Sequence, residues 1–305
     1  MNEIITNIKK LEAETLDNLK SSKSQNTIRA YNADIRDFVE FCSRHKLNFL
    51  PANPNIVSLY LTNLSKTSKF STLKRRLASI SIFHKTKGHY LDTKHPIISE
   101  NLLGIKRIKG SIQIAKKPIL INDLKKIIEA INQDKRSEFE ILKNKTLILL
   151  GFSGGFRRSE LVALQIEDVD FVDEGVKILV RRSKTDQSGE GLIKGIPYFE
   201  NNEYCPVIHL KKYIENLKIS SGKLFNICDK SVALKIKKYA MLAGLDYTKY
   251  AGHSLRSGFA TSTAEMGAEE RNIMAMTGHR SIQMVRRYIK EANLFKNNAL
   301  NKIKI

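Results

Sequence analysis

The spacing of apolar residues constrains the fold of this chain most, because it follows the period of an α-helix over most of the length. Apolar side chains recur three or four positions apart, as on one face of a helix, in stripes at 27–41, 56–64, 73–83, 124–131, 207–217 and 232–244. Val176, Ile178 and Val180 instead alternate as in a strand, and a polar turn leads to a second short strand near 192–199. We therefore expect a mainly α-helical protein with a small antiparallel β-sheet built on one hairpin.

The length of 305 residues favours two domains rather than one. The boundary is expected in the segment 106–117, which is basic, contains glycine and proline, and lacks a helical stripe. Residues 1–105 would then form a helical N-terminal domain, and residues 118–305 a larger domain that contains the hairpin. The segment 106–117 would either cross a nucleic-acid backbone or serve as an ordinary solvated linker.

The charge balance points to a polyanionic partner. The chain has 52 Lys and Arg against 31 Asp and Glu, a formal net charge of +21, and such an excess attracts nucleic acid or an anionic membrane surface. The excess is shared evenly, with +10 in residues 1–110 and +11 in the remainder. Both domains are therefore candidates to contact phosphates. Within the first domain, Lys69, Lys74, Arg75 and Arg76 lie at the start of one helix and would face a DNA groove or simply solvent.

The sequence gives no sign of a membrane or secreted protein. No apolar run reaches the roughly 20 residues of a membrane-spanning helix, and no hydrophobic signal core precedes a cleavage site. Cys42, Cys205 and Cys228 are odd in number and scattered, which is typical of reduced thiols and does not match zinc-ligand spacing. We expect a cytoplasmic protein without a metal site.

The sequence from Gly154 to Leu161 places an arginine at an unusual position. Two glycines end a strongly apolar helix, and another helix begins at Ser159, so that Arg157 lies in the turn between them. The planar guanidinium of an arginine matches two oxygens of a phosphate. Glu160, three residues on, would orient it. By itself, the pair is equally typical of a helix-terminal ion pair.

Three further signals lie near the end of the chain, and each has a purely structural alternative. His253 and Arg256 are one helical turn apart, a histidine that can exchange protons beside an arginine that stays charged. His279 follows Gly278, which is expected to end a helix. Tyr288 lies beside the apolar stripe of the last helix, formed by Ile282, Val285 and Ile289. Taken singly, these residues would more often be core or surface residues than catalytic ones.

Together and in this order, the signals resemble the tyrosine recombinase, or phage integrase, family. The resemblance rests on the Gly-Phe-Arg157-Arg-Ser-Glu160-Leu box, Lys184 in the hairpin, His253-x-x-Arg256, Gly-His279, and a tyrosine nine residues after that histidine. It covers residues 118–290 at the level of motifs. The N-terminal domain resembles the core-binding domain of the family by its arrangement alone, which implies a two-lobed clamp around double-stranded DNA.

The resemblance implies a mechanism. Tyr288 would attack the scissile phosphorus to form a 3′-phosphotyrosyl link, while Arg157 and Arg256 stabilise the charge on the phosphorane. Lys184 would protonate the leaving 5′-oxygen, His253 would exchange a proton with the tyrosine, and His279 would hydrogen-bond a phosphate oxygen. Because the phosphotyrosyl ester would conserve the energy of the broken phosphodiester bond, neither ATP nor a metal ion would be required. In agreement, the sequence contains no phosphate-binding loop and no acidic cluster typical of two-metal nucleases.

The family resemblance also implies self-association, and it leaves alternatives open. The apolar tail after Tyr288 (Leu294, Phe295, Leu300 and Ile303) would dock on a neighbouring subunit in a tetramer on DNA, or pack on its own domain. Such an enzyme would be nucleoid-associated. The alternatives are a type IB topoisomerase-like enzyme, a catalytically silent DNA-binding regulator of the same fold, and a two-histidine RNA phosphodiesterase.

Overall fold

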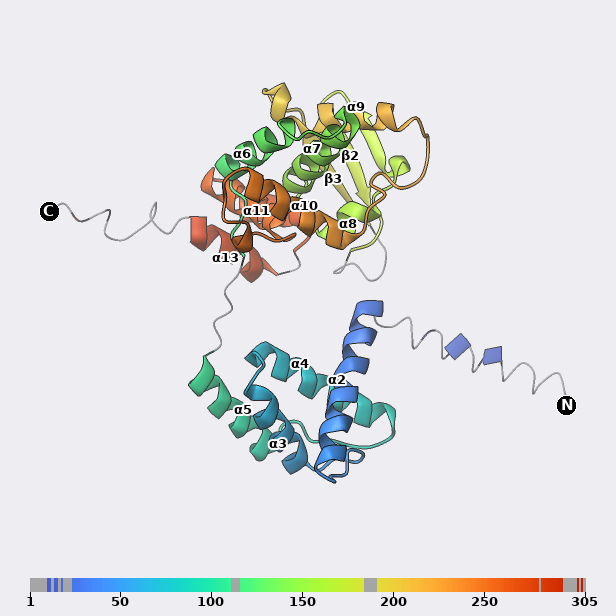
Figure 1. Cartoon of the computed structure of the whole chain (residues 1–305), viewed down its shortest axis with the longest axis vertical. Helices are drawn as coiled ribbons and strands as arrows, with labels where there is room; N and C mark the ends of the chain where they lie inside the picture. Colours follow the sequence, from blue (N-terminus) through green and yellow to red (C-terminus); the bar gives the residue numbers. More distant parts are fainter. Residues whose placement is uncertain are drawn as a thin grey trace. The chain divides into compact units, whose positions relative to one another are not determined.

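The chain forms two compact units in the computed structural model, residues 1–114 and residues 115–305 (Figure 1). The structure describes residues 24–110, 116–183, 191–279 and 281–292, together with a few isolated residues near both ends. Each unit has a hydrophobic core of its own. Among the described helices, none is both long and apolar enough to cross a lipid bilayer.

The first unit consists of four helices in the part that the structure describes: α2 (Gln25–Arg44), α3 (Pro54–Ser65), α4 (Phe70–Thr86) and α5 (Pro96–Lys109). Local signals fix several starts. The Ser24 and Asn53 side chains accept hydrogen bonds from backbone amides of the first turns of α2 and α3, and Pro54 and Pro96 occupy the first helical position. α3 packs against α5, and α2 against α4, around Phe38, Leu61 and Ile80.

A buried carboxylate organises the basic start of α4. Asp34 is 1 % exposed, and it accepts hydrogen bonds from Ser79 Oγ at 2.7 Å and from Arg75, and pairs with Arg76 Nε at 3.1 Å. Arg76 also pairs with Asp37 at 3.2 Å. The two arginines therefore hold α2 against α4, and the prediction that they face a DNA groove or open solvent is wrong for Arg76, which is largely covered.

Residues 106–109 are helical, contrary to the expectation of a linker without a helical stripe from residue 106. They form the last turn of α5, where Lys106, Arg107 and Lys109 compensate the negative end of the helix dipole. The helical stripe exists but is sparse, because Ile98 and Ile105 alone are buried. Gly110 follows with φ of 70°, which ends the helix.

The second unit is built around α7 (Glu138–Ser153), from which every residue between Asn144 and Ser153 is buried. Four helices pack around α7: α6 (Ile121–Asn132), α8 (Arg158–Ala163), α9 (Pro206–Leu217) and α11 (Ser254–Glu265). α10 (Asp229–Leu242) packs on α6 and α8, and α12 (Glu270–Thr277) and α13 (Ile282–Ala292) pack on α11. Short 3₁₀ turns lie at Ile166–Asp168, Asn202–Tyr204 and Tyr247–Lys249.

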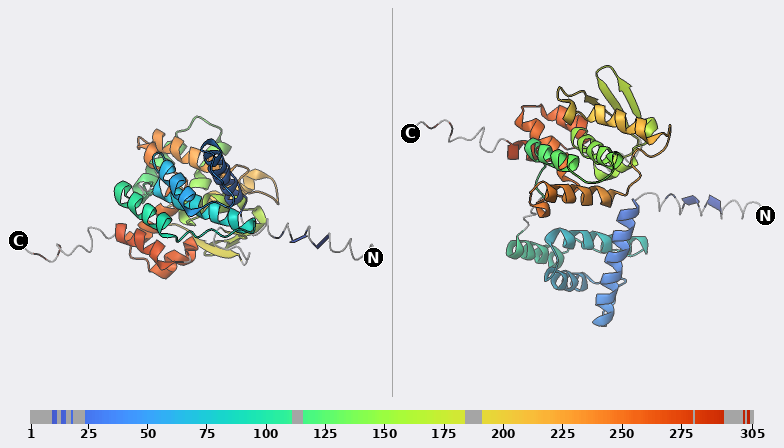
Figure 2. Two further views of the ribbon diagram at one scale, coloured as in Figure 1. Left: turned by 90° about the horizontal axis from the view of Figure 1, so that it is seen from below. Right: turned by 45° about the horizontal axis from the view of Figure 1, so that its top comes forward.

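The sheet of this unit is antiparallel, in the order β1 (Val169–Val172), β2 (Gly175–Val180), β3 (Leu192–Pro197). Val169 pairs with Ile178, and Val180 pairs with Leu192. Figure 2 shows the strands at one margin of the unit, beside its helices. The inward residues of β2 and β3 alternate, with Val176, Ile178 and Ile196 in the core.

The predicted fold class, mainly α-helical with a small antiparallel sheet, is confirmed. The hairpin lies where the alternating residues predicted it. β1 was not expected, because four half-buried or exposed residues carry no clear alternation. Lys184 lies in the connection between β2 and β3, outside the described residues.

Candidate active site

Arg157 lies in the turn that joins α7 to α8, as the sequence predicted. It is the N-cap residue of α8, and Glu160 in the first turn of that helix accepts from its backbone N–H at 2.9 Å and from its Nη1 at 2.5 Å. The Glu160 side chain is 2 % exposed and that of Arg157 15 %. A buried carboxylate thus fixes the guanidinium in one orientation while part of it stays accessible.

The two glycines before Arg157 are required by the geometry of this turn. Gly155 has φ of 54°, which side chains other than glycine adopt at a cost. A β-carbon at Gly155 would also come within 3.2 Å of Thr277, so this turn packs directly on the end of α12. The chain reversal and the close approach of a distant helix therefore explain Gly155, while a β-carbon at Gly154 would come within 2.1 Å of the Phe156 ring.

Arg256 is fully buried in the first turn of α11, and it is aimed at the same turn. Its Nη1 donates to the carbonyl oxygen of Gly155 at 2.8 Å. Its Nε and Nη2 are buried and have no hydrogen-bond partner among the described residues. Leaving buried N–H groups of a charged side chain unbonded is costly, so the two groups suit an acceptor beyond those that the described residues supply.

His253 precedes α11 as its N-cap residue rather than lying inside the helix. It is exposed, whereas Arg256 is buried, so the two residues one helical turn apart occupy a rim position and an interior position. Partial desolvation and the nearby guanidinium groups of Arg256, Arg157 and Arg158 lower the pKa of His253 below its usual value. The ring is therefore neutral at physiological pH and open to proton exchange with solvent.

His279 is held by the turn that ends α12. Gly278 caps this helix in the left-handed conformation, with φ of 62°, as the sequence predicted. The hydroxyl of Thr277 donates to the carbonyl oxygen of Ile273 at 2.5 Å, and it lies 2.7 Å from His279 Nδ1. Because the single hydroxyl proton is used in the first bond, Nδ1 carries the hydrogen of the second, and Nε2 is left with a free lone pair.

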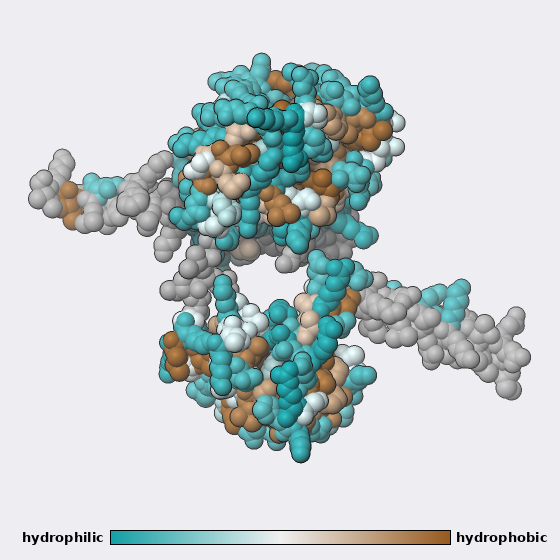
Figure 3. Space-filling model, in the orientation of Figure 1, coloured by the Kyte–Doolittle hydropathy of each residue, from teal (hydrophilic) through white to brown (hydrophobic). Residues whose placement is uncertain are grey.

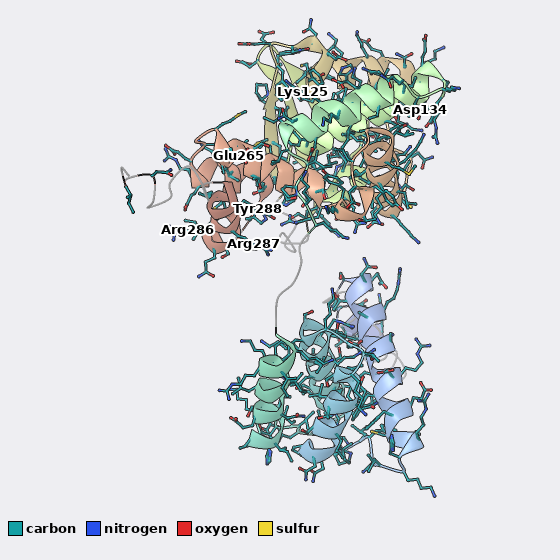
Figure 4. All side chains as sticks on the ribbon, turned by 60° about the vertical axis from the view of Figure 1, so that its left-hand side comes forward. Lys125, Asp134, Glu265, Arg286, Arg287 and Tyr288 are labelled. Carbon is teal, nitrogen blue, oxygen red and sulfur yellow. The ribbon has the colours of Figure 1, made fainter. Side chains whose placement is uncertain are left out.

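Tyr288 lies on α13 and contacts His279. The two ring centroids are 6.0 Å apart, at an interplanar angle of 36°. Figure 4 shows Tyr288 on the side of α13 nearer to the rest of the unit, whereas Arg286 projects elsewhere. Tyr288 is half-buried against the small cluster that contains Val285, while Ile282 is exposed, so the expected stripe is displaced toward Tyr288 and Ile289.

The structure thus brings five of the six predicted catalytic residues, and the supporting Glu160, to one place. The turn of Arg157 and the turn of His279 are joined directly, because Arg157 Nη2 donates to the carbonyl oxygen of Gly278 at 3.3 Å. The Tyr288 side chain is close enough to act electrostatically on Arg256. Lys184, the sixth, lies outside the described residues.

The electrostatics of this site favour an anion. Burial, followed by the charges of Arg256, Arg157, His253 and Lys194, lowers the pKa of His279 to about 4. Burial and the charge of Arg157 also lower the pKa of Arg256 to about 10. Glu160 is the carboxylate that counters these cations. The positive charges of this cluster repel one another, and a bound anion such as a phosphate would reduce that repulsion.

Lys194 is a residue of this site that was not expected from the sequence. It lies on β3, is 1 % exposed, and donates to the carbonyl oxygens of Gly154 and Met276. The available signal was its register, because Lys194 occupies an inward position of the strand, on the same face as Leu192 and Ile196. A lysine at an inward strand position is unusual and marks a functional or structural contact.

Comparison with known proteins agrees with this arrangement. Residues 119–294 match the model of the phage integrase family, and residues 15–88 match that of the phage integrase N-terminal SAM-like domain. An integrase/recombinase xerD homolog of Selenomonas ruminantium is 40 % identical, over 98 % of this chain and 91 % of that protein. The tyrosine recombinase XerC of Thermodesulfovibrio yellowstonii is 25 % identical, over 88 % of this chain and 87 % of its own length.

Solved structures show the same fold. The XerH site-specific recombinase bound to a palindromic difH substrate in a post-cleavage complex has a TM-score of 0.65 at 15 % identity, covering 91 % of this chain and 82 % of that one. A lambda integrase dimer bound to a COC′ core site has a TM-score of 0.59 at 16 % identity, covering 93 % and 75 %. The family model and the sequence relatives do not favour the topoisomerase-like or silent-regulator alternatives. The chain belongs to the phage integrase family and is a tyrosine recombinase.

Proposed function

We propose that this recombinase cuts and rejoins double-stranded DNA at specific sites through a covalent link between Tyr288 and a 3′-phosphate. The observation that carries the proposal is the buried guanidinium of Arg256, whose Nε and Nη2 lack partners among the described residues. It lies with Arg157, His279 and Tyr288 in one cationic cluster. A phosphate oxygen supplies the acceptors that these N–H groups lack.

Arg157 and Arg256 would bind the scissile phosphate between two anchored turns. Each arginine already spends one N–H on a backbone carbonyl, Gly278 for Arg157 and Gly155 for Arg256. The remaining N–H groups are preorganised for the additional charge on the pentavalent phosphorane, so little reorganisation is needed during the reaction. Glu160 supports this function by fixing the orientation of Arg157.

Tyr288 would act as the nucleophile with assistance from the histidines. The Tyr288 oxygen forms the new bond to phosphorus while the bond from phosphorus to the 5′-oxygen breaks. His253, neutral and open to solvent, would take the phenol proton. His279, fixed through Nδ1 by Thr277, would present Nε2 to the phosphate, and the negative charge of DNA would raise its pKa so that Nε2 can donate a hydrogen bond.

The leaving 5′-oxygen requires a proton, and Lys184 is the proposed donor. This residue is assigned by its place in the family motif between β2 and β3. Attack of a 5′-hydroxyl from another strand on the phosphotyrosyl link would reverse each step and restore Tyr288. The ester energy is retained throughout, which is why the proposed cycle uses neither ATP nor a metal ion.

DNA binding by the first unit, the proposed core-binding domain, is supported by a basic pocket. This lysine pocket lies at the start of α4 and is lined by Lys66, Lys69, Lys74, Lys106 and Lys109. All five lysines are exposed, and none forms an ion pair with a carboxylate among the described residues. Such lysines favour phosphate oxygens, and so does the positive end of the α4 dipole, where Lys69 and Lys74 lie. Figure 3 shows that hydrophilic residues cover much of the visible face of both units.

Assembly of a tetramer on DNA through the C-terminal tail is proposed on the basis of an apolar pocket in the second unit. Its volume is about 540 Å³, and it is lined mainly by apolar groups of α6, β3 and α11, including Leu124, Ile196 and Phe259. The tail residues Leu294, Phe295 and Leu300 lie outside the described residues, and Ile303 is exposed. Sedimentation on a two-site DNA should show tetramers that are lost when residues 293–305 are removed; unchanged tetramers would contradict this role.

A suicide-substrate assay tests the proposed reaction. Because the target sequence is unknown, the substrate is a library of nicked duplexes with randomised arms, from which covalent adducts are captured in denaturing detergent and sequenced. We expect adducts with the native chain that converge on one sequence, and none with Tyr288→Phe. Absence of any adduct with the native chain, or its persistence in Tyr288→Phe, would refute the assignment.

A further inference from the structure

Lys194 on β3 joins the two turns that carry Arg157 and His279. Its Nζ donates to the carbonyl oxygen of Gly154 at 2.6 Å and also to that of Met276. Gly154 lies three residues before Arg157, and Met276 lies three residues before His279. One amino group therefore links both turns to the sheet.

The contacts around Lys194 leave it little freedom. Its Nζ lies 4.5 Å from the centroid of the Phe156 ring, a cation–π distance, and the residue is 1 % exposed. Leu192 lies two positions earlier on the same face of β3. A β-carbon added to Gly278 would lie 3.3 Å from the Leu192 side chain. β3 thus contacts both ends of the turn between Met276 and His279.

The charged groups that face Lys194, and its burial, disfavour a positive charge on its amine. Among the described residues, Glu160 on α8 is the carboxylate that acts on it, whereas Arg157, at the start of that helix, and Arg256 on α11 repel it. Burial, which outweighs these charges, lowers the pKa of Lys194 to about 7. An apolar side chain of similar length would avoid this cost, so the lysine is explained by what its hydrogen bonds hold in place.

We propose that Lys194 is a positioning residue for strand cleavage, which holds the turns of Arg157 and His279 against each other through the carbonyl oxygens of Gly154 and Met276. This role rests on the proposed function, because it matters only if these two residues contact the scissile phosphate. Both charge states of the amine have the two N–H groups that the contacts require. The role therefore depends on the donors and does not require that Lys194 give up a proton.

Lys194 and Lys184 are both lysines of the second unit, and a positioning role can be separated by experiment from protonation of the leaving 5′-oxygen. A 5′-phosphorothiolate substrate has a sulfur leaving group that needs no protonation. It should restore cleavage to a variant that lacks the acid, but not to one in which the phosphate-binding groups are misplaced. Lys184→Ala is the reference for a missing acid.

The experiment compares Lys194→Met, which removes the donors, with Lys194→Arg, which retains donors, in single-turnover cleavage of the adduct-forming duplex. Lys145→Met is the matched control, because Lys145 on α7 is also buried but bonds to Asn132 instead. We expect Lys194→Met to bind the uncut duplex within about twofold of the native chain and to cleave roughly 100-fold more slowly, since small misplacements cost about that much. The phosphorothiolate should not restore this rate, whereas Lys194→Arg should recover part of it.

Two results would overturn the proposal: cleavage by Lys194→Met as fast as by Lys145→Met, or restoration by the phosphorothiolate, which would make Lys194 the acid. Lys194→Leu, which also removes the donors, replaces Lys194→Met if the latter does not fold. A second measurement needs no DNA. In an NMR titration of His279, removal of Lys194 should raise the pKa from its low value, and an unchanged titration would count against the link.

The NMR measurement also distinguishes failure of the proposed function from failure of the role proposed for Lys194. If the native chain forms no adduct with DNA, the proposed function fails, while the titration still shows whether Lys194 controls the surroundings of His279. If the adduct forms and Lys194→Met matches its control in both measurements, the proposed function stands and the role of Lys194 is refuted.

Discussion

At the scale of single residues, the site is defined by polar side chains that are anchored by hydrogen bonds to other groups of the protein. Arg157, Arg256 and Lys194 each donate to a backbone carbonyl oxygen, and His279 to the Thr277 hydroxyl. Such anchoring fixes the positions of the side chains before substrate arrives, which lowers the cost of reaching the transition state.

Lys184 gives the first prediction at this scale. Lys184→Ala should cleave a normal duplex about 100-fold or more slowly, because general-acid assistance contributes roughly that much. The same variant should cleave a 5′-phosphorothiolate duplex at a rate near that of the native chain. Quenched-flow measurement of adduct formation on both substrates checks this, and a variant equally slow on both would remove Lys184 from the role of acid.

His279 gives a prediction about stability and pH. Its pKa is lowered in the folded chain to about 4, against about 6.5 in an unfolded chain. Between these values the unfolded state binds more protons, so the free energy of unfolding falls as the pH drops through this range. From pH 7 to pH 5 this residue should account for a loss of about 2 kcal/mol.

The comparison is with His279→Asn, whose amide can still donate to Thr277. Urea denaturation at both pH values should show a smaller loss for this variant than for the native chain, by about 2 kcal/mol. Groups that titrate in both proteins cancel in the comparison. Equal losses in the two proteins would show that His279 is not kept neutral by its site.

At the scale of elements, the sequence predicts helices and the hairpin well, because their apolar periods are strong. The end of α7 and the end of α12 were predicted from glycines near the site, at Gly154–Gly155 and Gly278. Less of the site could be predicted. The contact between the two turns depends on how the segment of α7 and α8 packs against that of α11 and α12, about 100 residues further along the sequence. The contact of Lys194 depends on strand register.

The cap of α12 provides a prediction at this scale. Gly278→Ala places a side chain at φ of 62°, which should lower the free energy of unfolding by about 1–2 kcal/mol. The matched control is Gly244→Ala after α10, with φ of 71° and no neighbour within 4 Å of a new β-carbon. Both should lose similar stability in thermal denaturation, but only Gly278→Ala should slow adduct formation, since it shifts His279. Equal cleavage rates would contradict this function of the turn.

At the scale of the whole molecule, the net charge of +21 predicted a polyanion, and the structure shows which basic residues remain available for one. Arg75 and Arg76 are engaged with Asp34, a pairing that composition cannot reveal. The lysine pocket has no such carboxylate partners among the described residues. The even division of charge is thus an incomplete guide to the DNA-binding surface.

The lysine pocket leads to a prediction about salt dependence. Lys69→Gln with Lys74→Gln should weaken DNA binding and reduce the slope of log K against log salt by about 2, because roughly one counterion is released per phosphate contact. The control replaces Lys85 and Lys87, at the other end of the same helix, with glutamine. Fluorescence anisotropy with labelled duplex across a salt series checks both, and equal slopes for the two double variants would contradict the assignment.

The covalent link between protein and DNA is the central claim, and mass spectrometry of the trapped adduct tests it most directly. After digestion with nuclease and protease, we predict one modified peptide, which contains Tyr288 joined through its oxygen to a 3′-phosphorylated nucleotide. A nucleotide attached to any other residue, or joined through a 5′-phosphate, would contradict the account.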